Sequence, residues 1–152
     1  MESYNAAVDD AEGVLRTQGG AIRNTAGASF LSFVSSVKKH APATHIVYDQ
    51  HTPVTAQDSD AIIVLRNADR SVWQLDALRS ILMAQGTRRV IVVSSSTPYD
   101  LISFKAESTN YAHVACGEYT AQALDVVADV IFGKKKATGR LAVVLAVQDQ
   151  LQ

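Results

Sequence analysis

Short apolar segments alternate along the chain with longer segments whose apolar residues recur at helical spacing. The short segments are rich in β-branched residues, and "IVV" or "AIIVL" lack polar alternation, which is typical of strands covered on both faces. This order predicts βαβ units, and therefore a parallel sheet with helices on both faces. The expected strands are 44–49, 60–67, 89–95, 111–116 and 139–147, and the expected helices are 28–39, 71–86 and 120–133.

The N-terminal region has a different composition from the rest of the chain. Residues 2–17 are rich in Ala, Asp and Glu and predict a weakly amphipathic helix, which Gly19 and Gly20 end. We therefore expect an N-terminal helix and connecting arm over 1–27 and an α/β domain over 28–152. The predicted fold is a three-layer α/β/α sandwich with a mostly parallel sheet of about five strands and flavodoxin-like winding.

Composition narrows the classes of function. The 152 residues carry a formal net charge of −1, which argues against nucleic-acid and membrane partners. The first residues lack the basic start and apolar run of a signal peptide, and we expect a cytoplasmic location. Cys116 is the single cysteine, and the four histidines show no metal-site spacing. We therefore expect neither a metal nor a cofactor.

Polar residues gather where the expected strands end, which is where ligands bind in such sheets. Ser94 to Thr97 follow the strand at 89–95 and could form a phosphate cradle or supply a nucleophile. No glycine permits close backbone approach, however, and Pro98 removes one amide donor. His113 lies mid-strand, so we expect it to point into a sheet face rather than to the strand end. The sequence favours serines that satisfy exposed strand-end amides and start the next turn.

Charged residues at two other strand ends are also candidates. Asp69 and Arg70 lie between a strand and a helix, so Asp69 or Ser71 is expected to cap the helix. Arg70 is expected to pair with a carboxylate on a neighbouring loop, either Asp100 or Glu118. Glu118 precedes a helix, where the helix dipole stabilises a carboxylate and makes it a poor general acid.

Three stretches together resemble one family. In chain order they are "NADRSVWQLDALRSIL", "VIVVSSSTPYDL" and "GEYTAQALDVVADVIFGKKKATGRLAV". They are similar to the C-terminal α/β/α sandwich domain of glycoside hydrolase family 3, in its β-N-acetylglucosaminidase branch. The resemblance extends over residues 28–146. In the last stretch, Ala142 stands where the family has a proline.

This resemblance has consequences for catalysis. Family members pair this domain with a (β/α)8 barrel that carries the aspartate nucleophile and, in this branch, a histidine proton donor. The chain has no room for a barrel. In the β-glucosidase branch this domain supplies an acid/base glutamate three residues before an Asp-Arg pair. If Asp69 and Arg70 match that pair, Arg66 stands at the position of the glutamate. Since arginine does not deprotonate at working pH, we assign no catalytic residue.

The resemblance also identifies a missing element. The family has an inner strand before the helix at 28–39, whereas here "GAIRN" runs almost directly into that helix. A gap would leave backbone groups unpaired, at a cost of about 1–3 kcal/mol each when buried. Rearrangement, residues 14–24 or another chain must fill it. This predicts self-association or partner binding through that edge.

Two functions remain open at this stage. The first is a non-catalytic domain of glycosidase ancestry, acting as an interaction or carbohydrate-contacting module or as part of a two-domain glycosidase. Its partners would be a second copy, a barrel or a carbohydrate. The second is a small independent enzyme or small-molecule binder using the same strand ends, with Cys116 or His51 added. The expected binding residues are Arg66, Asp69, Arg70, Ser95, Asp100 and Glu118.

Overall fold

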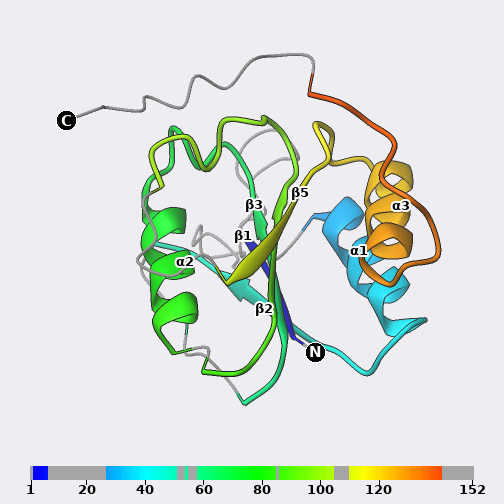
Figure 1. Cartoon of the computed structure of the whole chain (residues 1–152), viewed down its shortest axis with the longest axis horizontal. Coiled ribbons are helices and arrows are strands. Elements are labelled where there is room, and N and C mark those ends of the chain that lie inside the picture. Colours follow the sequence, from blue (N-terminus) through cyan, green and yellow to red (C-terminus); the bar gives the residue numbers. More distant parts are fainter. Residues whose placement is uncertain are drawn as a thin grey trace, which may run out of the picture.

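The computed structural model describes residues 2–6, 27–50, 54, 58–84, 86–104 and 110–141. Within them, five strands form one sheet in the order β2-β1-β3-β4-β5, and every neighbouring pair is parallel (Figure 1). This is the flavodoxin-like winding that the sequence predicts. The strands are β1 Glu2–Ala6, β2 Thr44–Tyr48, β3 Ala61–Leu65, β4 Val90–Ser94 and β5 Tyr111–Ala115. The helices are α1 Ala28–Lys38, α2 Trp73–Met83 and α3 Ala121–Ile131.

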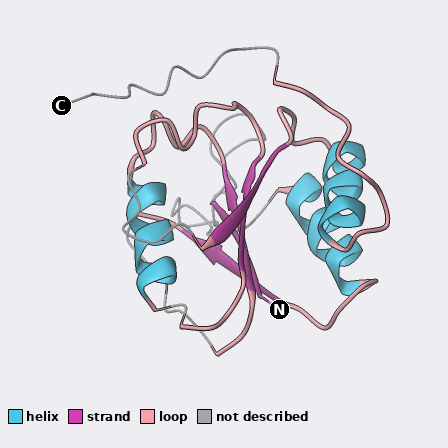
Figure 2. Ribbon diagram, viewed as in Figure 1, coloured by secondary structure: helices cyan, strands magenta, loops and turns pink. Residues whose placement is uncertain are grey.

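Helices cover both faces of the sheet, which confirms the three-layer sandwich. Helix α2 lies against one face, and α1 and α3 lie side by side against the other (Figure 2). All five residues of β3 are buried, which explains its run of apolar residues without alternation. Because successive side chains of a strand point to opposite faces, Ile63 and Leu65 pack beneath α2 whereas Ile62 and Val64 pack beneath α1 and α3.

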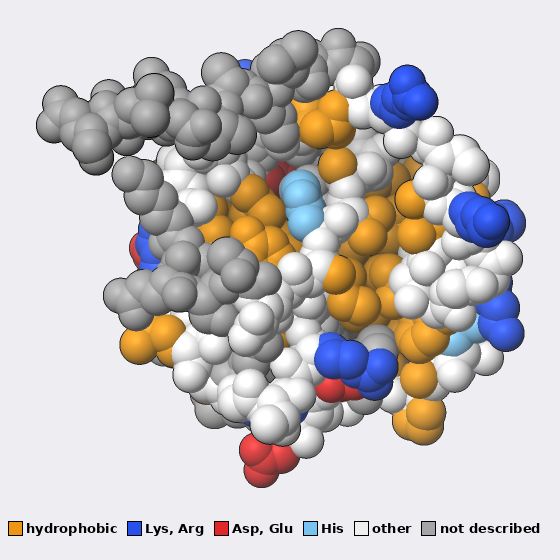
Figure 3. Space-filling view, in the orientation of Figure 1, with side chains coloured by type: hydrophobic (Ala, Val, Ile, Leu, Met, Phe, Trp, Pro, Cys, Tyr) orange, Lys and Arg blue, Asp and Glu red, His pale blue; other side chains and the backbone are white. Residues whose placement is uncertain are grey.

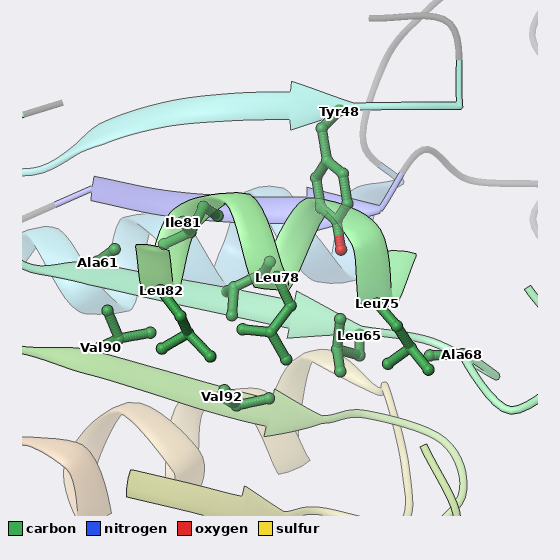
Figure 4. Close-up of a cluster of buried hydrophobic side chains, with 11 residues drawn as sticks. Tyr48, Ala61, Leu65, Ala68, Leu75, Leu78, Ile81, Leu82, Val90 and Val92 are labelled. Carbon is green, nitrogen blue, oxygen red and sulfur yellow. The ribbon is translucent and has the colours of Figure 1, made fainter. Parts of the chain in front are cut away.

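The core under α2 is built from apolar residues of one helix face and three strands (Figure 4). Leu75, Leu78 and Leu82 recur at helical spacing and belong to the same buried cluster as Val92 of β4. Tyr48 closes this core at the end of β2, where its hydroxyl donates a hydrogen bond to the Val64 carbonyl oxygen at 3.0 Å. The polar end of a buried tyrosine is thereby satisfied.

The prediction of a helix over 2–17 is wrong for its first part. Residues Glu2–Ala6 form β1, which pairs with β2 on one side and with β3 on the other. The rest of the expected helix and the "GAIRN" segment lie outside the described residues. The inner position of the sheet is therefore filled by this chain, which removes the structural reason for expecting self-association through an open edge. The boundary expected at residue 27 does not separate β1 from the sheet.

The remaining elements follow the predicted order, with one exception at the end of the described chain. The strand expected over 139–147 is not present at Gly139, Arg140 and Leu141, and residues 142–147 lie outside the described residues. Strand β5 is thus an edge of the sheet as far as the structure describes it. Among the described helices, none has the length and apolar character that crossing a membrane requires.

Candidate functional site

The carboxyl ends of β3, β4 and β5 lie at one end of the sheet, because the three strands are parallel and adjacent. The segments that follow them are 66–70, 95–100 and 116–120. We call these segments, with Ser94 at the end of β4, the strand-end rim. It contains all six residues that the sequence nominates for binding.

Gln74 of α2 holds the first of these segments. Its side-chain nitrogen donates to the Arg66 carbonyl oxygen at 2.8 Å, and its side-chain oxygen accepts from the Arg66 amide at 2.9 Å. The side chain is 2% exposed. An amide group of this kind offers one donor and one acceptor, as a neighbouring strand would. Gln74 therefore extends the pairing of β3 beyond its end and fixes where the rim begins.

Replacing Gln74 with leucine is expected to lower the free energy of unfolding by about 1–3 kcal/mol, because both backbone groups of Arg66 lose their buried partner. Asp76→Asn on the exposed side of the same helix is the matched control, with an expected change within about 0.5 kcal/mol. Urea denaturation measures both. A Gln74→Leu protein as stable as the control would show that the two hydrogen bonds between Gln74 and Arg66 do not stabilise the fold.

Asp100 is the most buried charged residue of the rim, at 0% exposure. Its Oδ1 accepts a hydrogen bond from the Ala68 amide at 2.7 Å, which ties the loop after β4 to the turn after β3. Burial raises the pKa of Asp100, and the nearby Asp69 raises it further, whereas the Ala68 amide and the Ser94 hydroxyl act in the opposite direction. That Asp100 takes part in binding stays a prediction.

The predicted partners of Asp69 and Arg70 are wrong. Arg70 is 83% exposed, and its Nε lies 3.8 Å from Asp69 Oδ2. It does not pair with Asp100, because that carboxyl is buried and its Oδ1 binds the Ala68 amide instead. Asp69 does not cap α2 either, since the helix begins after Val72 without a side-chain cap. Asp69 thus remains in the rim with its Oδ1 buried.

Ser95 has a structural role. Its amide and its hydroxyl both donate to the Leu65 carbonyl oxygen, at 3.0 Å and 2.8 Å. The sequence predicts serines that satisfy strand-end amides, whereas Ser95 satisfies a strand-end carbonyl group. Both of its donors are therefore already used within the fold.

Ser94 and His113 form a contact that sequence reasoning missed. Ser94 Oγ lies 2.9 Å from His113 Nε2. His113 lies on a sheet face as expected, but its ring also reaches the strand end, because His113 pairs with Val92 and Ser94 lies two residues further along the same face. Side chains lean along the strand, so such diagonal neighbours meet. Burial lowers the pKa of His113.

Arg66 and Glu118 make contacts of a different kind. The Arg66 guanidinium is buried over the Tyr119 ring, 4.3 Å from its centroid, and Tyr119 packs on the core beneath α1 and α3. Glu118 is exposed, and its backbone carbonyl accepts a hydrogen bond from Cys116 Sγ at 2.8 Å. Burial raises the pKa of that thiol. His51 lies outside the described residues.

The rim keeps several hydrogen-bonding oxygens without protein partners. Asp69 Oδ1, Thr97 Oγ1 and Asp100 Oδ2 are buried atoms that have no hydrogen-bond partner in the described part of the chain. Buried oxygens of this kind are costly unless something donates to them. All three can accept a hydrogen bond from any donor that reaches them.

Metal binding has no support in the described ranges, where no group of three His, Cys, Asp or Glu side chains could hold a metal ion. The surface around β5 is instead partly apolar. Figure 3 shows a histidine side chain near the middle of this face, with hydrophobic side chains on both sides of it. Such a face offers apolar contact beside a few polar groups, as ligand sites commonly do.

Comparison with known proteins gives a similarity of fold. No family model matches the chain, and no curated protein matches it. A solved structure with 24% sequence identity superposes with a TM-score of 0.60, over 88% of this chain and 14% of that chain. It is described as a GCN5-related glucosamine N-acetyltransferase region in a fungal multi-domain GH3 β-N-acetylglucosaminidase. The chain therefore shares its α/β fold with a segment of a much longer multi-domain protein.

Proposed function

We propose that this chain is a non-catalytic domain of glycosidase ancestry that contacts a carbohydrate at the strand-end rim. The observation that carries the proposal is the set of three buried oxygens without protein partners, Asp69 Oδ1, Thr97 Oγ1 and Asp100 Oδ2. Sugars present several hydroxyl donors close together, and each one that reaches such an oxygen relieves a desolvation cost of about 1–3 kcal/mol.

The structural neighbour supports a carbohydrate context. It is a multi-domain protein whose description names a β-N-acetylglucosaminidase and a glucosamine N-acetyltransferase region. Separately from this structural neighbour, three stretches of the sequence resemble a glycoside hydrolase family. Two lines of reasoning thus favour an amino sugar or a related hexose as the ligand, and the rim supplies the acceptors for it.

The chemistry of the rim supports a role without glycoside cleavage. That reaction needs two catalytic groups on opposite sides of one bond. Asp100 uses one of its oxygens to hold the Ala68 amide, and Arg66 stands where the resemblance places a glutamate. The Arg66 guanidinium lies over Tyr119, and it stays protonated at working pH. Asp100 and Arg66 therefore do not supply a carboxylic acid within reach of a sugar oxygen.

The Thr97→Val variant tests the site, because valine has nearly the same shape but no hydroxyl. It is expected to weaken sugar binding about tenfold, the equivalent of one lost hydrogen bond. Titration calorimetry with N-acetylglucosamine, glucosamine and glucose measures this. Asp76→Asn on the far side of α2 is the control and should bind as the unaltered chain does. Absence of binding to all three sugars, or equal binding by Thr97→Val, would overturn the proposal.

Two activity assays complete the test. The unaltered chain is incubated with chromogenic N-acetylglucosaminide and glucoside substrates, and separately with glucosamine and acetyl-coenzyme A. We expect no turnover in either assay. Acetyl transfer or glycoside cleavage that disappears on changing Asp100 would show that the domain is catalytic.

A further inference from the structure

We propose that the adjoining C-terminal ends of helices α1 and α3 form a second interaction surface, which binds a carboxylate-rich segment of a partner protein. The surface is built from five exposed lysines and is called the lysine patch: Lys38, Lys39, Lys134, Lys135 and Lys136. The chain contains six lysines, so all but one of them lie in this patch. The inference does not depend on carbohydrate binding at the strand-end rim.

The lysine patch and the strand-end rim lie at opposite ends of the sheet. Helix α1 connects the parallel strands β1 and β2, so it ends near the amino end of β2. Helix α3 starts directly after the rim segment 116–120, and its last residues lie against the end of α1. In Figure 3, Lys or Arg side chains project from the side of the molecule where α1 and α3 lie. A ligand at the rim would therefore leave the patch accessible.

Contacts between the two helix ends bring the two lysine runs together, although the runs lie far apart in the sequence. His40 follows α1 directly, and its Nε2 lies 3.4 Å from Asp129 Oδ1 of α3. The His40 ring also stacks on Phe132, with the ring centroids 4.8 Å apart. On the other side of the same carboxylate, Lys135 Nζ lies 3.2 Å from Asp129 Oδ2. Asp129 thus links the end of α1 to the lysines that follow α3.

Acidic side chains do not neutralise the patch. The Asp129 carboxylate is shared between Lys135 and His40, and the other four lysines form no ion pair within the described ranges. A helix dipole accounts for a lysine in the last turn of α1, but its effect falls off within that turn. The lysines at 134–136 lie beyond the end of α3. The patch therefore keeps a surplus of positive charge, which an anionic partner would neutralise.

The charge of the rest of the chain favours a short acidic segment over an extended polyanion. Outside the patch, the nine remaining Lys and Arg face fifteen Asp and Glu, a balance of −6. A membrane surface or a nucleic-acid duplex is negative over an area larger than the patch, so it also meets this negative remainder and is repelled. A carboxylate-rich segment can contact the patch alone. Lysines suit such a partner, because their flexible stems let the ammonium groups follow carboxylates at varied positions.

Fluorescence anisotropy with a labelled oligoglutamate peptide measures binding to the patch. The titrations are made at about 0.1 M salt, where exposed charges more than about 10 Å apart are largely screened. Lys38→Gln/Lys39→Gln and Lys134→Gln/Lys136→Gln should each weaken binding about fivefold, because each double variant removes two charges that face the peptide. Arg79→Gln/Met83→Glu on α2 is the matched control. It lowers the net charge by the same amount on the other face of the sheet, and should bind within about twofold of the unaltered chain.

A further variant changes the affinity in the opposite direction, so that a loss of folding cannot imitate its effect. Asp129→Asn removes the carboxylate that lies among the lysines, and should tighten binding of the oligoglutamate peptide at least about twofold. Asp76→Asn removes one negative charge from α2 and is the matched control, with unchanged binding expected. Unchanged or weaker binding by Asp129→Asn would contradict the position of the peptide on the patch.

The remaining outcomes each decide one part of the inference. If only one of the two lysine double variants weakens binding, the two helix ends do not form one surface. If the α2 control weakens binding equally, net charge and not the patch is responsible. Failure of the peptide to bind, or tighter binding of duplex DNA or phosphatidylserine vesicles, would overturn the carboxylate-rich partner. The lysine variants should bind sugars as the unaltered chain does, so this inference and the proposed function can fail separately.

Discussion

Tyr4→Pro is expected to destabilise the protein by about 3 kcal/mol or more, because it places a proline in the middle of an inner strand. Residue 4 of β1 lies between Ile46 of β2 and Ile63 of β3 in the pairing register. Proline removes one backbone N–H, and its ring disturbs the groups around it. Each buried backbone group left without a partner costs about 1–3 kcal/mol.

Tyr4→Phe is the control for this experiment, because it alters the side chain and keeps the backbone N–H. Urea denaturation followed by circular dichroism gives the free energy of unfolding of both variants. If Tyr4→Pro loses less than about 1 kcal/mol relative to Tyr4→Phe, a central position of β1 is excluded.

Leu78→Ala is expected to lower the free energy of unfolding by about 2–5 kcal/mol, the range for truncating a buried leucine. Leu78 is 0% exposed and lies in the centre of the apolar cluster between α2 and the sheet (Figure 4). Removing three carbon atoms leaves a cavity that the helix and the sheet can close only by moving toward each other. The effect should shift the midpoint of urea unfolding and not its slope.

Met83→Ala provides the matched control on the same helix. Met83 is 83% exposed, so its truncation should change stability by no more than about 0.5 kcal/mol. If Leu78→Ala and Met83→Ala lowered the free energy of unfolding equally, the position of α2 would be contradicted. A helix packed on one side loses stability when its buried face is truncated and little when its exposed face is.

Much of the fold could be predicted from sequence because its central elements carry local signals. The runs at β3 and β4 are apolar without alternation, and this pattern arises only where both faces of a strand are covered. The apolar face of α2 repeats at helical spacing for the same reason. Parallel winding then follows from strands that alternate with helices.

Strand β1 could not be found in this way. It has five residues, "ESYNA", which show neither an apolar run nor a clear alternation. Its partners lie far along the chain, and a local pattern contains no information on such pairing. Composition favours a helix there, and tertiary pairing overrides that preference.

The candidate site could likewise be predicted only in part. Strand ends identify the rim, and Asp100 and Asp69 lie in it. The predicted ion pair between Arg70 and Asp100 is wrong, because the prediction assumes that both charges are exposed. The burial of Asp100 is visible only in the folded structure. The contact between His113 and Ser94 depends on the register of β4 against β5 and on the lean of side chains, neither of which is written in the spacing of residues.

The position of β1 also sets an order of events during synthesis on the ribosome. Glu2 pairs with Thr44 on one side and with Ala61 on the other, so β1 acquires both neighbours only when about sixty further residues have been made. At typical rates of elongation that interval is roughly 3–12 s. Strand β1 therefore stays on the nascent chain for seconds with both edges open before its two neighbours have been made.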